Sequence, residues 1–368
     1  MNMSRSSEKK NGKRLLLAAY ELSLTAALAY LALYKVFNGP SPAVRNALTM
    51  TLLEPSATKW IPYLFLPREK VEHIRDAARA DAADPGTEHA VLRADASDTG
   101  PADIDWSLLP DGIKIEELRG RTYNAHVMLV RDPSRMYLAL SSYSGFSETV
   151  PGKRLSVMME EEQASAGINA GAFNDDGTGG AHVGSVPAGL TIHGGRVVSD
   201  TCKDFVPEKG FCGFNKDHVL VVSHDMSAEE ARREGIEEGC AFGPVLIRNG
   251  EIDPSVYAGY SGYNPRTAIG QRPDGTVILL CADGRQAGSL GATYKDLIDV
   301  MVSYGACTAF NLDGGSSTAM FYRDSEGKYG TRGEVRMINS YSVLQSVPRR
   351  MPTFWMVRPM GDRDHEGV

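Results

Sequence analysis

The strongest constraint on the fold is a series of short apolar runs, separated by turn-forming residues, that begins near residue 111. Several runs are joined by Gly-Gly, Asn-Gly or Asp-Gly steps, which adopt the positive φ angles that tight hairpins need. Most of this region is therefore expected to form β-sheet. The predicted strands lie at residues 124–132, 135–142, 188–199, 218–223, 242–252, 267–283 and 306–313.

Two helices are predicted among these strands. Residues 153–165 carry apolar side chains at helical spacing. A second helix is expected to begin at Thr293, because Asp296 follows at the capping-box position, and to end at Gly305. Strands outnumber helices and do not alternate strictly with them. The pattern predicts the α+β class, a mixed β-sheet domain with few flanking helices, rather than a doubly wound sheet.

An apolar segment precedes this domain and is long enough to cross a membrane. Residues 15–34 contain one charged side chain, Glu21, and twenty helical residues span about 30 Å, the thickness of a hydrocarbon core. We predict an uncleaved transmembrane signal anchor at residues 15–37. The alternative is a cleaved signal peptide, because "ALA" at residues 27–29 resembles a cleavage site.

The charge distribution sets the expected topology and excludes one class of partner. The chain has a net charge of −7, but residues 1–14 carry five basic side chains and one acidic one, so the remainder carries −11. Basic residues before a membrane helix place the N-terminus in the cytoplasm and the large C-terminal part outside. An acidic body lacks the basic surface of a nucleic-acid-binding protein.

The chain is expected to have five parts. Residues 1–14 form a basic cytoplasmic tail, followed by the membrane helix. Residues 38–110 look like a connector that includes an Ala/Asp-rich stretch of the kind found in solvated linkers. Residues 111–358 form the main domain and residues 359–368 a polar tail. Three aromatic residues of the connector could contact either the membrane surface or the main domain: Trp60, Tyr63 and Phe65.

The five cysteines argue against a structural zinc site, because no pair has C-x-x-C spacing. An exported location permits disulfides. Cys202 and Cys212 flank a loop-like "KDFVPEKGF" that could bring them together, and five buried thiols are the alternative. The odd count leaves at least one cysteine unpaired in either case.

Polar clusters follow or precede several predicted strands. Each one alone is typical of an ordinary turn, because Asp-Gly and Asn-containing segments commonly end strands. The clusters are "GINAGAFNDDG" with Asn169 and Asp175, "YNPRTAIG" with Arg266, "CADGR" with Asp283 and Arg285, and "NLDGGSSTAM" with Asp313.

Taken together, the clusters predict a site for an anionic sugar or a phosphoester. Asp283 and Asp313 emerge from apolar strands, where burial and neighbouring charge shift the pKa of a carboxylate. Arg266 and Arg285 supply forked donors that suit phosphate. The run after Asp313 can form an anion-binding nest of backbone N–H groups with added hydroxyl donors. Its members are Gly314, Gly315, Ser316, Ser317 and Thr318.

The order of these motifs resembles the phosphodiester glycosidase family over roughly residues 120–350. Residues 265–321 match in both spacing and order, and the resemblance adds Asn339 to the expected site. It implies an α+β domain that hydrolyses sugar-1-phosphodiesters. Ser316 replaces the usual third glycine and Ala172 the usual second aromatic residue, so the identity of the sugar stays open. The motifs are "INAGAF", "GPVLIRNG", "PRTAIG", "ADGR", "GATYKDLIDVMVSYGACTAFNLDGGSSTAMFY" and "NSYSV".

The chemistry of such a substrate fits these residue types. The leaving group is a phosphate monoester, which is already a stable anion, so a strong general acid is less necessary than in ordinary glycosidases. We expect Arg266 and Arg285 to stabilise the phosphate. We expect Asp313 or Asp283 to support the oxocarbenium-like sugar or to activate water.

The predicted function is that of a membrane-anchored, extracytoplasmic glycosidase acting on surface or extracellular glycans. No cofactor is required by the sequence, although Ca²⁺ or Mg²⁺ could bind Asp175, Asp283 and Asp313. One alternative is a non-catalytic protein of glycan binding or exopolysaccharide assembly that uses the same pocket. Another is a metal-dependent phosphodiesterase that cleaves the P–O bond. The oligomeric state, and whether the reaction retains or inverts configuration, are open.

Overall fold

The chain forms two compact units, Met1–Arg79 and Ala80–Val368, which are described separately. The computed structural model confirms the α+β class, with antiparallel sheets and a single long apolar helix near the N-terminus. It describes residues 2–54, 58–80, 104–174, 184–201, 210–258, 261–325, 327–328, 331–341 and 348–361.

The described part of the first unit consists of helices and short connecting turns. It contains α1 (Asn2–Phe37), α2 (Pro42–Leu53), α3 (Pro62–Phe65) and α4 (Arg68–Ala80). Within α1, Leu17–Phe37 is long and apolar enough to cross a membrane, with a mean hydropathy of 1.4. A small apolar core joins the end of α1 to the later helices through Phe37, Leu66, Val71 and Ile74.

The second unit is built from β-strands with four short helices, among the residues that the structure describes. The helices are α5 (Leu155–Glu161), α6 (Ala228–Arg233), α7 (Pro254–Ala258) and α8 (Tyr294–Ser303). The strands are β1 (Ile113–Arg119), β2 (Asn124–Val130), β3 (Met136–Leu140), β4 (Ala166–Asn169), β5 (Leu190–His193), β6 (Arg196–Asp200), β7 (Phe211–Asn215), β8 (Leu220–Ser223), β9 (Ile236–Ala241), β10 (Val245–Arg248), β11 (Glu251–Ile252), β12 (Arg266–Gln271), β13 (Val277–Ala282), β14 (Thr308–Leu312), β15 (Met320–Arg323), β16 (Val335–Met337) and β17 (Thr353–Val357).

These strands form three antiparallel sheets. The first sheet has the order β1-β2-β13-β12-β14-β10-β11, the second β16-β15-β4-β17-β3, and the third β6-β5-β9-β7-β8. All seven predicted strand regions lie in these sheets. The strands outside the predicted ranges are β1, β4, β7, β9, β15, β16 and β17.

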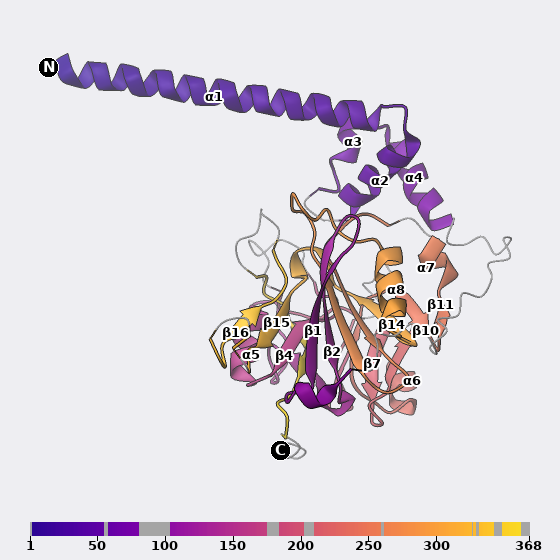
Figure 1. The fold of residues 1–368 in the computed structure, drawn as a ribbon. Coiled ribbons are helices and arrows are strands. Elements are labelled where there is room, and N and C mark those ends of the chain that lie inside the picture. Colours follow the sequence, from indigo (N-terminus) through magenta and orange to yellow (C-terminus); the bar gives the residue numbers. More distant parts are fainter. Residues whose placement is uncertain are drawn as a thin grey trace. The chain divides into compact units, whose positions relative to one another are not determined.

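The first two sheets pack face to face and carry helices on their outer faces. Alternate residues of β12 and β13, such as Ile269 and Leu279, share one core with Ile168 and Trp355 of the second sheet. The opposite face of the first sheet packs on α8, and the outer face of the second sheet packs on α5. In Figure 1, α5 and α8 flank the strands from opposite sides. Because both faces are covered, β13 is apolar along its whole length.

The strand register brings the predicted polar clusters to one edge of this sandwich. Arg266 at the start of β12 pairs with Ala282 at the end of β13, and Thr267 pairs with Leu312 at the end of β14. In the second sheet, β15 begins beside the end of β4. We call this region the loop edge: the segments that follow β4, β13 and β14 and those that precede β12 and β15.

The predicted capping box of α8 is present. Thr293 Oγ1 accepts a hydrogen bond from Asp296 N at 3.2 Å, and Asp296 Oδ2 accepts one from Thr293 N at 2.8 Å. We expect Thr293→Ala to lower the free energy of unfolding by about 1 kcal/mol, because the Asp296 N–H at the helix start loses its side-chain acceptor. Urea unfolding of the full chain in detergent measures this. Ser303→Ala at the other end of α8 is the control, and an equal loss in both variants would contradict the assignment.

Candidate functional site

Asn169 lies at the end of β4 and joins the two main sheets through its side chain. It is fully buried. Its Nδ2 donates to the carbonyl oxygen of Asp313 at 2.5 Å, while its Oδ1 accepts from Thr267 Oγ1 at 2.8 Å and from Ala319 N at 3.1 Å. Asn169, which was predicted to bind substrate, therefore holds the turn at Asp313 in place through buried hydrogen bonds.

The turn after β14 places a carboxylate and two glycines at the loop edge. Asp313 is half-buried, and its Oδ1 accepts from Gly314 N at 2.9 Å. Gly315 has a φ of +62° and donates its N–H to Pro265 O at 2.8 Å. A Cβ on Gly314 would lie 2.7 Å from that same oxygen, so a side chain there would force the two segments apart.

Arg285 is brought against this turn. A Cβ built on Gly315 would lie 3.2 Å from Arg285 Nη2, so the guanidinium passes directly beside the Gly315 backbone. The same Nη2 donates to Asn264 Oδ1 at 2.9 Å, which orients the planar group. Arg285 and the turn after Asp313, which were predicted to belong to one site, thus lie side by side.

Arg266, in contrast, lies on the other face of the first sheet. Strand alternation directs Thr267 toward the second sheet and Arg266 toward α8. The Arg266 guanidinium donates to Gly262 O at 3.0 Å and to Ala292 O at 3.3 Å, and it lies 4.2 Å from the centre of the Tyr294 ring. These contacts hold together the segments that flank β12 and α8.

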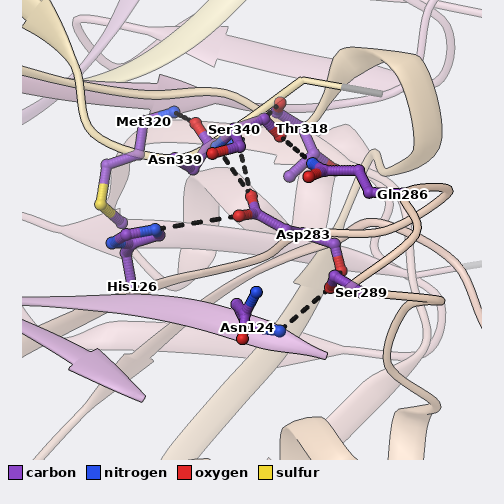
Figure 2. Close-up of polar contacts among 9 residues, drawn as sticks. All are labelled: Asn124, His126, Asp283, Gln286, Ser289, Thr318, Met320, Asn339 and Ser340. Atoms are coloured by element: carbon purple, nitrogen blue, oxygen red, sulfur yellow. Dashed lines mark hydrogen bonds and ion pairs between the residues drawn. The ribbon is translucent and has the colours of Figure 1, made fainter. Parts of the chain in front are cut away.

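Asp283 lies in a buried polar network (Figure 2). Its Oδ1 accepts from Ser340 N at 2.9 Å and from Asn339 Nδ2 at 3.3 Å, and its Oδ2 lies 3.9 Å from His126 Nε2. The side chain is 3% exposed. Burial raises the pKa of Asp283, and the Ser340 N–H, the nearby His126 and the Asn339 amide oppose that rise without cancelling it.

Asn339 connects this network to the start of β15. Its Oδ1 accepts from Met320 N at 2.7 Å, and its Nδ2 also contacts Thr318 O at 3.3 Å (Figure 2). Ser289 Oγ donates to the Asp283 carbonyl at 2.7 Å. The network therefore ties the segments after β13 and β16 to the run after Asp313.

His126 is a member of the network that sequence reasoning missed. It lies on β2 opposite Cys281 and is 9% exposed, and its Nδ1 has no hydrogen-bond partner among the described residues. Figure 2 shows its ring directed at Asp283. Strand alternation in "NAHVMLV" could have identified this residue, because it puts residue 126 on the same buried face as Met128.

The hydroxyl run contributes three side chains with different surroundings. Ser316 Oγ accepts from Arg349 Nη1 at 3.3 Å, and the Arg349 guanidinium lies 4.7 Å from the centre of the Phe173 ring. The hydroxyls of Ser317 and Thr318 are buried and make no hydrogen bond within the described chain. Arg349 adds a cation to the loop edge, and no sequence motif predicted this residue.

The predicted metal and disulfide residues are only partly described. Asp175 and Cys202 lie outside the described residues. No group of three or more His, Cys, Asp or Glu side chains suited to a metal occurs in the described part of the chain. Asp283 and Asp313 follow strands that β12 separates, so their backbones lie about 10 Å apart, two strand spacings. Cys212 Sγ lies 4.0 Å from Cys240 Sγ, its neighbour on β9.

A family model described as phosphodiester glycosidase matches residues 162–358, more than half of the chain. The chain belongs to the phosphodiester glycosidase family, as its motifs predicted.

Two similar proteins illustrate the range of the family. The SPbeta prophage-derived uncharacterized protein YomE of Bacillus subtilis (strain 168) is 29% identical over 194 residues, which are 51% of this chain and 28% of that protein. The chain thus spans under a third of the length of that relative. The catalytic domain of zebrafish N-acetylglucosamine-1-phosphodiester alpha-N-acetylglucosaminidase, auto-inhibited by its pro-peptide, has the same fold. It superposes with a TM-score of 0.51 and 20% identity, covering 67% of this chain and 82% of that one.

The contacts of Asn169 predict a large effect on stability. Asn169→Ala leaves the buried Thr267 hydroxyl and the Ala319 N–H without their shared acceptor, so the free energy of unfolding should fall by about 2–3 kcal/mol. Thr267→Val removes one of the three bonds and should cost about 1 kcal/mol. Urea unfolding of both variants in detergent measures the difference. A loss below that of Thr267→Val would show that Asn169 does not join the sheets.

The raised pKa of Asp283 predicts a pH dependence of stability. The folded state binds the proton of this carboxyl more tightly than the unfolded chain, whose pKa is near the ordinary 3.8. The resulting stabilisation is complete below that value and is lost as the pH rises through the folded pKa. Asp283→Asn removes it, so the stability of the wild type relative to Asp283→Asn should decrease as the pH rises from about 4 toward neutrality. A relative stability that increases over this range would contradict the assigned direction.

Proposed function

We propose that the chain is a membrane-anchored hydrolase that cleaves the glycosidic bond of sugar-1-phosphodiesters, such as N-acetylglucosamine-1-phosphodiesters, in surface or extracellular glycans. The observation that carries the proposal is the contact between the Arg285 guanidinium and the Asp313–Gly315 turn. A forked cation and a carboxylate at one turn suit a substrate in which a phosphate adjoins the reacting carbon of a sugar.

In this proposal the phosphate is bound by Arg285, with Arg349 as a second cation beside Ser316. Arg285 is half-buried and held by Asn264, so it loses little side-chain freedom when it binds an anion. Arg266, predicted as a phosphate ligand, is now assigned a positioning role. Its contacts with Gly262 and Ala292 fix the segment that carries Asn264.

Asp313 is the proposed reacting carboxylate. It is half-buried at the loop edge, and the Gly314 N–H fixes the direction of its Oδ1. The phosphate monoester leaves as a stable anion, so the main demand is to stabilise the oxocarbenium-like sugar or to activate water. Asp283 is almost fully buried and is proposed to support Asn339 and the Thr318 backbone, with His126 as its neighbour.

The proposed location follows from α1. The apolar window within Leu17–Phe37 has none of its residues buried by the rest of the chain, as suits a lipid-exposed helix. Basic residues at the N-terminus favour a cytoplasmic tail and an external catalytic domain. The mass of the membrane-bound protein tests the anchor, since loss of about the first 29 residues would show a cleaved signal peptide.

The activity is tested with a synthetic N-acetylglucosamine-1-phosphodiester and the full chain in detergent, with and without chelator. Free sugar and a phosphomonoester are the expected products. Asp313→Asn should lower kcat by at least about 10²-fold, because a positioned carboxylate is lost. Arg285→Lys should mainly lower kcat/KM, by about tenfold, because a point charge replaces a bidentate fork.

Asp217→Asn is the matched control, because Asp217 is an exposed acid in the β7–β8 turn. It should leave the rate unchanged, and all three variants should keep the melting temperature of the wild type. A fully active Asp313→Asn would overturn its catalytic role. Sugar-1-phosphate as the product would instead identify a P–O phosphodiesterase, and binding without turnover a glycan-binding protein.

A further inference from the structure

The segment that contains α3 packs along the end of the candidate membrane helix. The Phe65 ring lies 5.1 Å from the ring centre of Tyr30 and 5.0 Å from that of Phe37, stacked on the latter. Tyr30 and Phe37 are seven residues apart, which is about 10 Å along a helix. Residue 65 is therefore level with the last two turns of α1, inside the range Leu17–Phe37 that is apolar enough to span a membrane.

The side chains beside Phe65 are largely apolar and exposed, and the Tyr63 hydroxyl donates to Glu72 Oε1 at 3.1 Å. Trp60 is 57% exposed, Tyr63 39% and Leu64 58%. The neighbouring surface of α1 is equally apolar, with Leu31 53% and Tyr34 49% exposed. An apolar surface that continues from a membrane helix onto a short following helix indicates one common environment for both.

The charges around this segment match a membrane interface. Residues 60–66 carry no charge. Exposed basic side chains lie on either side, Lys59 before and Arg68 and Lys70 after, with the exposed acid Glu69 between the latter two. Trp and Tyr concentrate where the hydrocarbon meets the headgroups, and flanking Lys and Arg reach outward to lipid phosphates. In α4, Val71 and Ile74 face the small core, Glu72 and Arg75 are half-buried, and Asp76 is exposed.

We propose that residues 60–66 are inserted into the extracytoplasmic interface of the bilayer, beside the end of α1. The occupant of the exposed surface is lipid, with Trp60 and Tyr63 at headgroup level and Leu64 in contact with acyl chains. An interfacial helix buries its apolar face about 5–10 Å below the headgroups. The contacts of Phe65 with Tyr30 and Phe37 hold α3 beside the end of α1. The inference rests on the proposed membrane anchoring of α1.

The test uses the full chain reconstituted in phosphatidylcholine–phosphatidylglycerol vesicles. The lipids are unbrominated, brominated near the headgroup end of the acyl chain, or brominated near its terminal methyl. The fluorescence of Trp60 is the difference between the wild type and Trp60→Phe, since the other tryptophans, Trp106 and Trp355, belong to the second unit. Trp60 is exposed, so Trp60→Phe should fold normally.

We expect the shallow bromines to quench the Trp60 signal about twofold and the deep bromines to quench it less. Flotation of the vesicles in a density gradient reports the anchoring separately. Flotation without quenching would overturn the interfacial position alone and leave the anchor standing. Protein that does not float would overturn both, and neither result bears on the hydrolysis of a sugar-1-phosphodiester.

Strongest quenching by the deep bromines would also overturn the proposal, because it would place Trp60 in the hydrocarbon core. A second copy of the chain or another protein on this surface would appear as flotation with an unquenched Trp60. Leu64→Glu offers an independent check. A charge at this position should shift the Trp60 signal toward that of an exposed indole, whereas Asp76→Asn, at a residue of α4 that is 65% exposed, should leave it unchanged.

Discussion

The candidate site depends on the buried side chain of Asn169. One amide forms hydrogen bonds to the carbonyl of Asp313, the hydroxyl of Thr267 and the N–H of Ala319. These partners belong to segments of two different sheets, so the amide fixes the distance between the sheets at the loop edge. Removal of a buried amide with three hydrogen-bond partners lowers the stability strongly, and only one orientation of the amide satisfies all three partners. The turn that carries Asp313 is rigid for this reason.

Neighbouring side chains of β12 point to opposite faces of the first sheet and therefore have different partners. Thr267 faces the second sheet and contacts Asn169, whereas Arg266 faces α8 and joins Gly262, Ala292 and Tyr294. Asn264 precedes both and receives a hydrogen bond from Arg285. The position of the Arg285 guanidinium at the loop edge thus depends on the Arg266 guanidinium, which is buried on the opposite face of the first sheet.

Local signals predicted much of this fold, and long-range register decided the rest. The capping box of α8 and the hairpin turns act over a few residues, and they were predicted correctly. The ordered motifs also predicted that Arg285 and the Asp313 turn belong to one site. His126 and Arg349 join it only because β2 lies beside β13 and because the chain returns near Ser316 after β16. The helices α2, α3 and α4 were read as a connector, because the Pro and Gly residues between them hide their periodicity. Strand alternation along β12 predicts that the side chains of Arg266 and Thr267 point to opposite faces of the sheet. It does not predict which of the two faces the site.

The central claim is that the residues around Asp313 and Arg285 break the bond between the sugar carbon and the phosphate oxygen. The most direct measurement is hydrolysis of a sugar-1-phosphodiester in water labelled with heavy oxygen, followed by mass spectrometry of both products. The account predicts that the label enters the released sugar, because water attacks carbon and the phosphate monoester leaves intact. Label in the phosphate would contradict it, since attack at phosphorus would make the enzyme an ordinary phosphodiesterase.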